Sequence, residues 1–221
     1  MFITFEGIDF CGKSTQVELL KNHLLSKNKK VEIIREPGGT EISEKVRNIL
    51  LDRKHNNMFM ETEIFLFSAA RAQLVREKIR HYLEQGIYVI SDRFHDSTTA
   101  YQGFGRGLSP ESVEHINRLA IGDTIPDITF FIDVPVEEAE NRKKMRENNH
   151  LDRIEVSNLD FYQRVRNGYL YIANQEKRFR IIDGKEKIED IHKKIVNEIA
   201  LLEKKELVWV LVNYIKLFLP E

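Results

Sequence analysis

The segment at residues 7–14 constrains this chain more than any other. It reads Gly-Ile-Asp-Phe-Cys-Gly-Lys-Ser, follows the apolar, β-prone run 2–5 and precedes a stretch with helical spacing at 15–20. A strand that enters G-x-x-x-x-G-K-S and continues into a helix is typical of a phosphate-binding loop, where backbone N–H groups and the helix N-terminus hold phosphates. Lys13 then reaches the β- and γ-phosphates of a nucleoside triphosphate, and the Ser14 hydroxyl can ligate Mg²⁺. The predicted ATP-binding residues of the loop are Gly7, Ile8, Asp9, Phe10, Cys11, Gly12, Lys13, Ser14 and Thr15.

Composition narrows the class of protein. The 221 residues suffice for one α/β domain with a substantial core, and 34 basic against 35 acidic residues give no general positive field for nucleic acid. A single cysteine excludes an intramolecular disulfide and fits a reducing compartment. The first predicted strand leaves no room for a signal peptide, and the apolar run 207–219 is too short to span a bilayer and contains Lys216. We expect a cytoplasmic protein without membrane contact.

The order of predicted elements indicates the fold. Strand-like runs at residues 2–5, 31–34, 88–91, 128–134 and 179–182 alternate with helical patterns. Continuous β-branched and aromatic runs are typical of strands buried on both faces, so we predict a doubly wound α/β fold with a parallel five-stranded sheet flanked by helices. Residues 1–206 form the predicted domain, and residues 207–221 form an apolar, helical C-terminal extension.

The second predicted strand is followed by a candidate anion site. Ligands of parallel α/β sheets bind at the carboxyl ends of strands, so Arg35 could hold a phosphate there. The turn Pro37-Gly38-Gly39 would let a ligand approach the backbone. An ordinary turn beside a solvated arginine explains this segment equally well.

The third and fourth strands also end in charged residues. Asp92 stands where a carboxylate meets Mg²⁺ directly or through water, and Arg93 could bridge two phosphates. An ion pair between these two neighbours is the alternative, but adjacent strand residues point to opposite faces. Asp133 is a weaker metal candidate, and we expect it to cap the helix that begins near Val136.

One predicted helix carries a possible nucleobase site. Phe67 and Arg71 are four residues apart and share a helix face, so a stacking ring would lie beside a donor for a base carbonyl. A core phenylalanine beneath a surface arginine is the commoner meaning of such a pair.

Five ordered segments together resemble one family. Residues 91–102, Ser-Asp-Arg-Phe-His-Asp-Ser-Thr-Thr-Ala-Tyr-Gln, are similar to the signature of thymidylate kinases. The segments 5–9, 35–40, 67–71 and 151–155 resemble the other blocks of that family, in the same order over roughly residues 1–200. The resemblance implies a homodimeric P-loop kinase fold that uses ATP and Mg²⁺ to phosphorylate dTMP to dTDP for dTTP synthesis.

The resemblance also implies roles for individual residues. Phe67 stacks on thymine, Arg71 bonds its exocyclic oxygen, and the ring of Tyr101 packs where a ribonucleotide carries its 2′-hydroxyl. Asp9 accepts from the 3′-hydroxyl, and Thr98 and Gln102 read the edge of the base. The implied dTMP-binding residues are Asp9, Arg35, Pro37, Phe67, Arg71, Arg93, Ser97, Thr98, Tyr101 and Gln102. Those implied for catalysis are Lys13, Arg93, Asp9 and Arg153, and those for the metal are Ser14 and Asp92.

The phosphate loop departs from the family pattern. Family members carry small residues, or in some relatives an arginine, where Phe10 stands, and Phe10 cannot supply that charge. The basic segment 141–154 is therefore expected to be an exposed lid that closes over ATP. We predict that at least one of Arg142, Arg146 and Arg153 contacts the ATP phosphates, although a solvated charge run is the commoner fate of such segments.

Other classes of nucleotide-binding protein fit less well. A GTPase should carry an N-K-x-D segment, and Asn28-Lys29-Lys30-Val31 lacks the aspartate. A nucleotide sensor would not need Asp9, Arg93 and a basic lid together. The apolar helix face of the extension after residue 206 favours packing on the body or on a neighbouring chain. Contact with a membrane surface is the alternative, but the extension lacks a cationic face, and the sequence does not decide between them.

Overall fold

Five parallel strands form one sheet in the order β2-β3-β1-β4-β5. The strands are β1 (Phe2–Glu6), β2 (Val31–Arg35), β3 (Tyr88–Asp92), β4 (Ile128–Asp133) and β5 (Phe179–Asp183). The computed structural model describes residues 1–145 and 151–218. The predicted doubly wound parallel sheet is confirmed, and β1, β2, β3 and β5 each run one residue past the predicted end.

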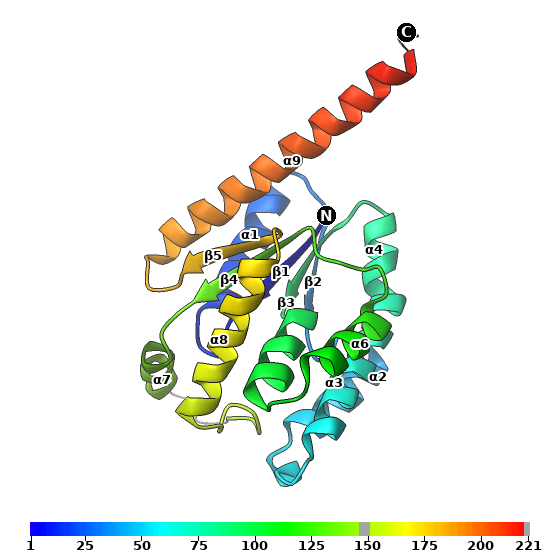
Figure 1. The fold of residues 1–221 in the computed structure, drawn as a ribbon. Helices are drawn as coiled ribbons and strands as arrows, with labels where there is room; N and C mark the ends of the chain where they lie inside the picture. The colour runs from blue at the N-terminus through cyan, green and yellow to red at the C-terminus, as the bar shows by residue number, and fades with distance from the viewer. Residues whose placement is uncertain (146–150, 219–221) are drawn as a thin grey trace.

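Helices cover both faces of this sheet (Figure 1). Along β1, Phe2 packs in the cluster that contains Leu74 and Ala120, whereas Phe5 packs in the cluster that contains Leu20. Successive strand residues point to opposite faces, so α3 and α6 lie on one side and α1 on the other. The helices are α1 (Lys13–Ser26), α2 (Glu41–Leu51), η1 (Arg53–His55), α3 (Met60–Leu74), η2 (Val75–Ile79), α4 (Arg80–Glu84), α5 (His95–Thr98), the π-helical η3 (Thr99–Gly105), α6 (Pro110–Ile121), α7 (Val136–Lys144), α8 (Leu159–Gln175) and α9 (Ile188–Phe218).

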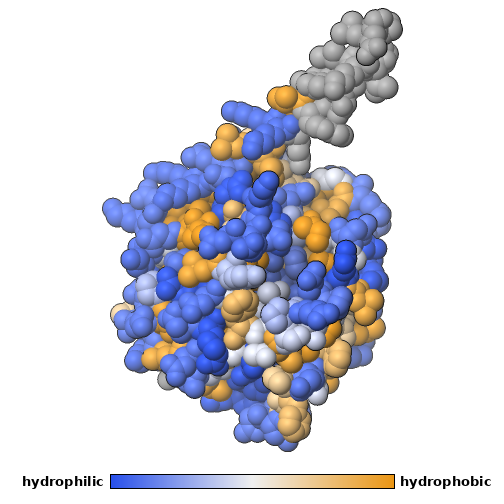
Figure 2. All heavy atoms as spheres, viewed as in Figure 1, coloured by the Kyte–Doolittle hydropathy of each residue, from blue (hydrophilic) through white to orange (hydrophobic). Residues whose placement is uncertain are grey.

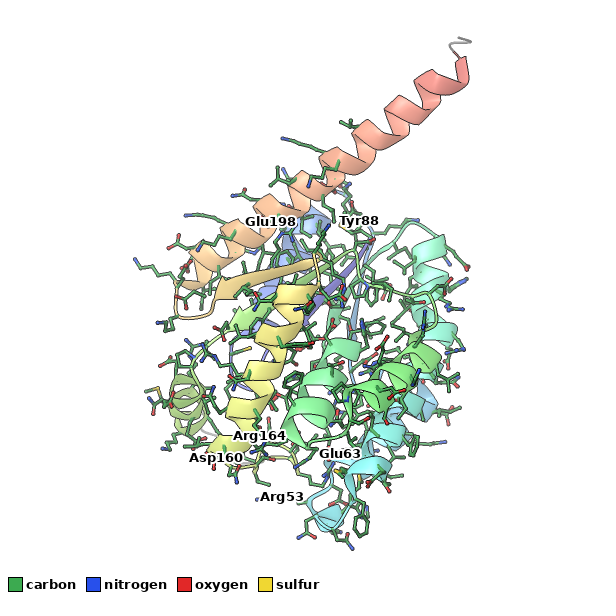
Figure 3. All side chains as sticks on the ribbon, in the orientation of Figure 1. Arg53, Glu63, Tyr88, Asp160, Arg164 and Glu198 are labelled. Atoms are coloured by element: carbon green, nitrogen blue, oxygen red, sulfur yellow. The ribbon has the colours of Figure 1, made fainter. Side chains whose placement is uncertain are left out.

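The last helix, α9, continues through the predicted domain boundary at residue 206. Its first half is tied to the sheet, because Glu198 pairs with Arg180 at 2.5 Å and Glu203 accepts from Tyr88 (Figure 3). Its C-terminal end projects away from the body (Figure 1). Within the described part of the chain, no helix combines the length and the apolar character that a bilayer span needs.

The surface is mixed rather than dominated by one kind of side chain. The face in Figure 2 is mainly hydrophilic, with hydrophobic side chains in separate groups. The parallel strands all direct their carboxyl ends to one edge of the sheet, where Glu6, Asp92 and Asp133 stand. Ligands of such folds bind at that edge.

Candidate active site

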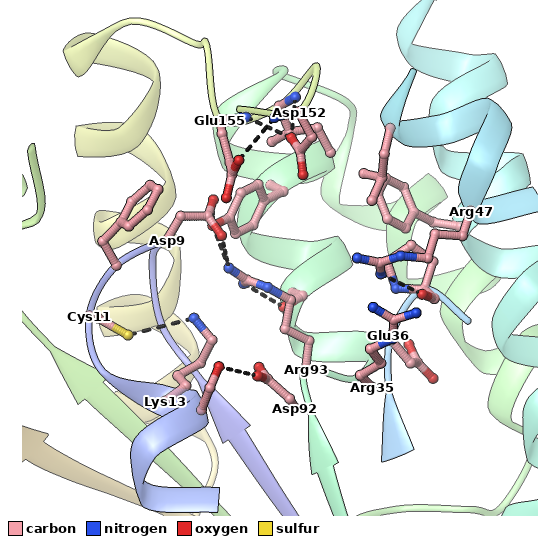
Figure 4. Close-up of a pocket in the computed structure, with 18 of the residues that line it drawn as sticks. Asp9, Cys11, Lys13, Arg35, Glu36, Arg47, Asp92, Arg93, Asp152 and Glu155 are labelled. Atoms are coloured by element: carbon pink, nitrogen blue, oxygen red, sulfur yellow. Dashed lines mark hydrogen bonds and ion pairs between the residues drawn. The ribbon is translucent and has the colours of Figure 1, made fainter. Parts of the chain in front are cut away.

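A cavity of about 660 Å³ opens at the carboxyl edge of the sheet (Figure 4). It joins the loop after β1, the segment after β2, the face of α3 and the helix after β3. The predicted site residues that line it are Asp9, Phe10, Cys11, Gly12, Lys13, Ser14, Thr15, Arg35, Pro37, Phe67, Arg71, Asp92, Arg93, Ser97, Thr98, Tyr101, Gln102 and Arg142. The predicted triphosphate side and the predicted acceptor side therefore share one space.

The loop after β1 requires its glycines for steric reasons. Gly7 has φ 143°, and a Cβ there would lie 2.6 Å from the carbonyl oxygen of Ile132. Gly12 has φ 104° and precedes α1, so the helix N-terminus faces the cavity. Phe10 adopts φ 65° without being glycine, a conformation that costs free energy in an L-residue. The loop is thus held in the shape that presents backbone N–H groups to an anion.

Lys13 folds back onto the loop that precedes it. Its Nζ donates to the carbonyl oxygens of Gly7 at 3.1 Å and Ile8 at 3.0 Å, and it lies 3.6 Å from Sγ of the buried Cys11 (Figure 4). These acceptors are neutral, and the carboxylate of Asp9, which the charge of Lys13 also influences, is already paired with Arg93, so the ammonium lacks full charge compensation. A phosphate in the cavity would supply that compensation.

Ser14 and Asp92 form the candidate metal site. The Ser14 hydroxyl donates to Asp92 Oδ2 at 3.0 Å, although the two residues are far apart in sequence (Figure 4). A hydroxyl beside a carboxylate is a hard oxygen donor set that suits Mg²⁺, which keeps most of its ligands as water and substrate phosphate. The described residues hold no group of three or more His, Cys, Asp or Glu able to bind a metal by themselves. The residues present fit a magnesium ion shared with a nucleotide.

Arg93 is the most densely bonded side chain in the cavity. Nη2 lies 2.5 Å from Asp9 Oδ1 and 3.0 Å from the Tyr101 hydroxyl, while Nη1 donates to the Gly7 carbonyl at 2.9 Å. Its backbone is left-handed, with φ 74°. Burial raises the pKa of Asp9, but Arg93 and Lys13 outweigh it and hold that pKa below its usual value. Asp9 is therefore an anion that holds a cation at the centre of the cavity.

Glu6 lies beneath this arginine and shapes the turn that carries it. Its carboxylate accepts from the Phe94 N–H at 2.7 Å and from the hydroxyls of Ser97 at 2.6 Å and Tyr169 at 2.9 Å. Burial raises the pKa of Glu6 from 4.5 to about 7. The residue fixes the start of the segment 94–98 without lining the cavity itself.

The far end of the cavity is organised by α3. Arg71 is buried, donates Nε to Glu36 at 2.6 Å and donates Nη1 to the Thr98 hydroxyl at 2.7 Å. Burial raises the pKa of Glu36, which Arg71 opposes. Phe67 lies one turn away on the same cavity wall, so the aromatic ring and the guanidinium share one helix face as predicted.

The predicted lid needs correction at its ends. Residues 141–144 belong to α7, and Arg153 and Ile154 are buried, so the segment is not exposed throughout. Arg142 lines the cavity and donates Nη1 to the Cys11 carbonyl at 3.3 Å. Arg153 instead pairs with Glu63 at 2.6 Å, away from the cavity wall. Arg146 lies outside the described residues.

A second correction concerns the end of β4. Asp133 does not cap the following helix, which begins at Val136 without a side-chain cap. Its two carboxylate oxygens accept from Arg166 at 2.7 and 2.9 Å. This bidentate pair joins β4 to α8, so tertiary contact outweighs the local capping preference.

The sequence did not point to several residues that line this cavity or contact its lining. Tyr162 of α8 donates to Asp9 Oδ2 at 3.0 Å, and Arg47 of α2 lines the wall and donates to the Pro37 carbonyl at 2.7 Å. Glu36 and Asp152 also line the cavity, within the segments 35–40 and 151–155, and the resemblance implies no role for either. Nothing in the spacing of Tyr162 or Arg47 marks them, because their elements reach the site only through the folded topology.

Comparison with known proteins agrees with this geometry. The model of the family described as thymidylate kinase matches residues 5–195. A thymidylate kinase of Kosmotoga olearia is 48% identical over 206 residues, which cover 93% of this chain and 98% of that protein. The thymidylate kinase of Fervidobacterium nodosum is 49% identical over 89% of this chain and 96% of that protein. That of Prosthecochloris aestuarii is 48% identical over 93% of this chain and 98% of that protein. The chain belongs to the thymidylate kinase family.

Proposed function

We propose that this kinase transfers the γ-phosphoryl group of ATP to dTMP, with Mg²⁺, and releases dTDP and ADP. The main support is that the phosphate loop and the residues implied for the nucleotide acceptor line the same cavity. Family membership supports the same substrate. Direct transfer needs both phosphates side by side, and a shared cavity supplies that proximity.

In the proposed reaction, the protein does little covalent chemistry. A phosphate oxygen of dTMP attacks the γ-phosphorus of ATP, the bond from that phosphorus to the β,γ-bridging oxygen breaks, and ADP leaves with its electron pair. The attacking oxygen is already ionised, so no general base is required. Lys13 and Arg93 would align the two phosphates and offset their charge. Mg²⁺ bound by Ser14 and Asp92 would neutralise charge on the ATP phosphates.

The acceptor end would recognise the nucleoside. Phe67 offers a ring for stacking, while Arg71, already oriented by Glu36, offers donors to an exocyclic carbonyl oxygen. The Tyr101 ring is buried against Arg93 and the aromatic residues of α8. A 2′-hydroxyl pressed against such a wall would lose its hydration, which favours deoxyribose.

A coupled assay of ADP release tests this function. Purified protein is given ATP, Mg²⁺ and one of dTMP, dUMP, dCMP or dGMP, and the initial rate is measured for each. We expect the highest kcat/KM with dTMP and background ATP hydrolysis without an acceptor. Equal rates with and without dTMP would refute the proposal.

A homodimer and a cytoplasmic location are further parts of the proposal. Large apolar side chains are exposed on three neighbouring helices, namely Ile42 and Ile49 on α2, Phe65 on α3 and Leu119 on α6. Such residues are typical of a subunit interface. Light scattering should give twice the 26.0 kDa chain mass, and Phe65→Glu should reduce it toward one chain. A monomer at all concentrations would contradict this.

The single cysteine supports the proposed cytoplasmic location, because a free, buried thiol suits a reducing compartment.

A further inference from the structure

Helix α3 carries a polar residue in line with Phe67 and Arg71. Glu63, Phe67 and Arg71 are spaced four residues apart, so they lie along one face of the helix. Phe67 and Arg71 line the main cavity, whereas Glu63 lies behind its wall and is buried. Figure 3 labels Glu63 on this helix. Burying a carboxylate lowers the stability of the fold unless its oxygens are hydrogen-bonded or paired with cations.

Glu63 is the shared acceptor of one amide and two guanidinium groups. Gln102 Nε2 donates to Glu63 Oε1 at 2.8 Å. Arg106 donates to the two oxygens at 3.1 and 3.2 Å, and Arg153 lies 2.6 Å from Oε2. Two cations fix the carboxylate in place and in its ionised form, so its only available role toward Gln102 is that of an acceptor.

We propose that Glu63 is a positioning residue that sets which end of the Gln102 amide faces the nucleobase, and thereby selects thymine over cytosine. This inference rests on the proposed function and on the base-reading role that the family resemblance implies for Gln102. Gln102 lines the cavity beside Thr98 and Tyr101, whereas Glu63 does not touch the cavity. Arg71 hydrogen-bonds the Thr98 hydroxyl, as Glu63 hydrogen-bonds the Gln102 amide. Helix α3 therefore fixes both side chains that would face the edge of the base.

The selectivity follows from donor and acceptor chemistry. Because Gln102 Nε2 donates to Glu63, the carbonyl oxygen Oε1 is the acceptor that the amide can offer a ligand. Thymine carries N3–H, a donor from which this oxygen can accept a hydrogen bond. Cytosine carries an unprotonated N3, an acceptor that would be left facing another acceptor. Burying cytosine N3 without a hydrogen-bond partner weakens the binding of dCMP enough for the site to discriminate strongly against it.

Arg106 and Arg153 predict what a neutral side chain at position 63 would do. In the variant Glu63→Gln, the two guanidinium groups would draw the new carbonyl oxygen toward themselves, and the new NH₂ group would face Gln102. Gln102 would then turn its Oε1 toward position 63 and its Nε2 toward the cavity. The cavity would then present an N–H donor to the base, and that donor could bond the unprotonated N3 of cytosine.

The experiment measures kcat/KM for dTMP and for dCMP in four proteins and one further control variant. These are the wild type, Glu63→Gln, Gln102→Ala and the double variant. Glu61→Gln is the matched control, because it removes an exposed carboxylate from the same first turn of α3. Far-UV circular dichroism and melting temperature show whether each variant folds. If Glu63→Gln does not fold, Glu63→Asp replaces it, since it keeps the charge but draws the carboxylate back from Gln102.

We expect Glu63→Gln to lower the dTMP-to-dCMP ratio of kcat/KM by at least about tenfold, and Glu61→Gln to leave it unchanged. In the Gln102→Ala background, the same Glu63 substitution should have no further effect on the ratio. A folded Glu63→Gln that keeps the wild-type ratio while Gln102→Ala lowers it overturns the inference and leaves the role of Gln102 intact. An unchanged ratio in Gln102→Ala overturns the role of Gln102 itself, and the inference with it.

Discussion

Arg93 and Asp9 form an ion pair in the middle of the cavity, with Nη2 of Arg93 2.5 Å from Oδ1 of Asp9. The pair joins the end of β3 to the loop after β1, and the hydroxyls of Tyr101 and Tyr162 donate to the other oxygen of Asp9 at 3.0 Å. Asp9 thus holds the guanidinium between the two halves of the cavity. An arriving phosphate would meet a cation that is already oriented.

Replacing Arg93 with lysine should damage turnover far more than folding. Lysine keeps the charge but cannot reach Asp9, Tyr101 and the Gly7 carbonyl at once with a planar fork. We expect kcat to fall by roughly 10²–10³-fold in steady-state assays. The control Arg180→Lys alters a surface pair with Glu198 and should retain wild-type kcat. A kcat within twofold of wild type for Arg93→Lys would contradict the assigned role.

The requirement for Mg²⁺ should depend on Asp92. Asparagine can still accept from Ser14 but lacks the charge that holds a divalent cation. Asp92→Asn should therefore raise the Mg²⁺ concentration for half-maximal rate by roughly 10–100-fold. The matched control is Asp133→Asn, because Asp133 also ends a strand but pairs with Arg166. An identical Mg²⁺ titration for Asp92→Asn and wild type would remove Asp92 from the metal site.

The two described arginines of the predicted lid should behave differently. Arg142→Ala removes a guanidinium from the cavity wall, so kcat should fall by at least about tenfold with little change in stability. Arg153→Ala breaks a buried pair with Glu63 and should cost about 3 kcal/mol in urea unfolding.

Lys144→Ala is the control for both measurements, because Lys144 is an exposed cation of the same segment. Normal turnover in Arg142→Ala, together with a stable but inactive Arg153→Ala, would reverse these two assignments. It would then favour the catalytic role first expected of Arg153.

Glu6 should make stability depend on pH. Burial raises its folded pKa to about 7 from an ordinary 4.5, so the folded state favours the neutral acid. Its stabilising contribution is complete below the ordinary pKa and is lost as pH rises toward and through about 7. Between pH 5 and 8, wild type should lose on the order of 3 kcal/mol relative to Glu6→Gln. Parallel urea unfolding curves at these pH values check this, and a constant difference between the two proteins would contradict it.

Much of the donor side could be predicted because its residues are contiguous. Lys13 and Ser14 follow a strand and begin a helix, and that local geometry alone fixes where they lie. Asp92 and Arg93 were also predictable, because the ends of parallel strands converge at one edge of the sheet. In each case the sequence itself carries the information about position.

The remaining residues depend on contacts between distant segments. Arg153 looks like a lid residue in sequence, but Glu63, ninety positions earlier, holds it away from the cavity. Tyr162 meets Asp9 only because α8 packs over the same edge. Charge and spacing predict neither contact, since both follow from how the helices pack on the sheet.

The central claim is that this chain makes dTDP from dTMP and ATP, and direct observation of the product tests it best. Phosphorus NMR of a reaction containing dTMP, ATP and Mg²⁺ distinguishes a new β-phosphate on dTDP from free inorganic phosphate. We expect dTDP and ADP to appear in equal amounts, and neither to appear with Lys13→Met. Inorganic phosphate without dTDP would contradict the account.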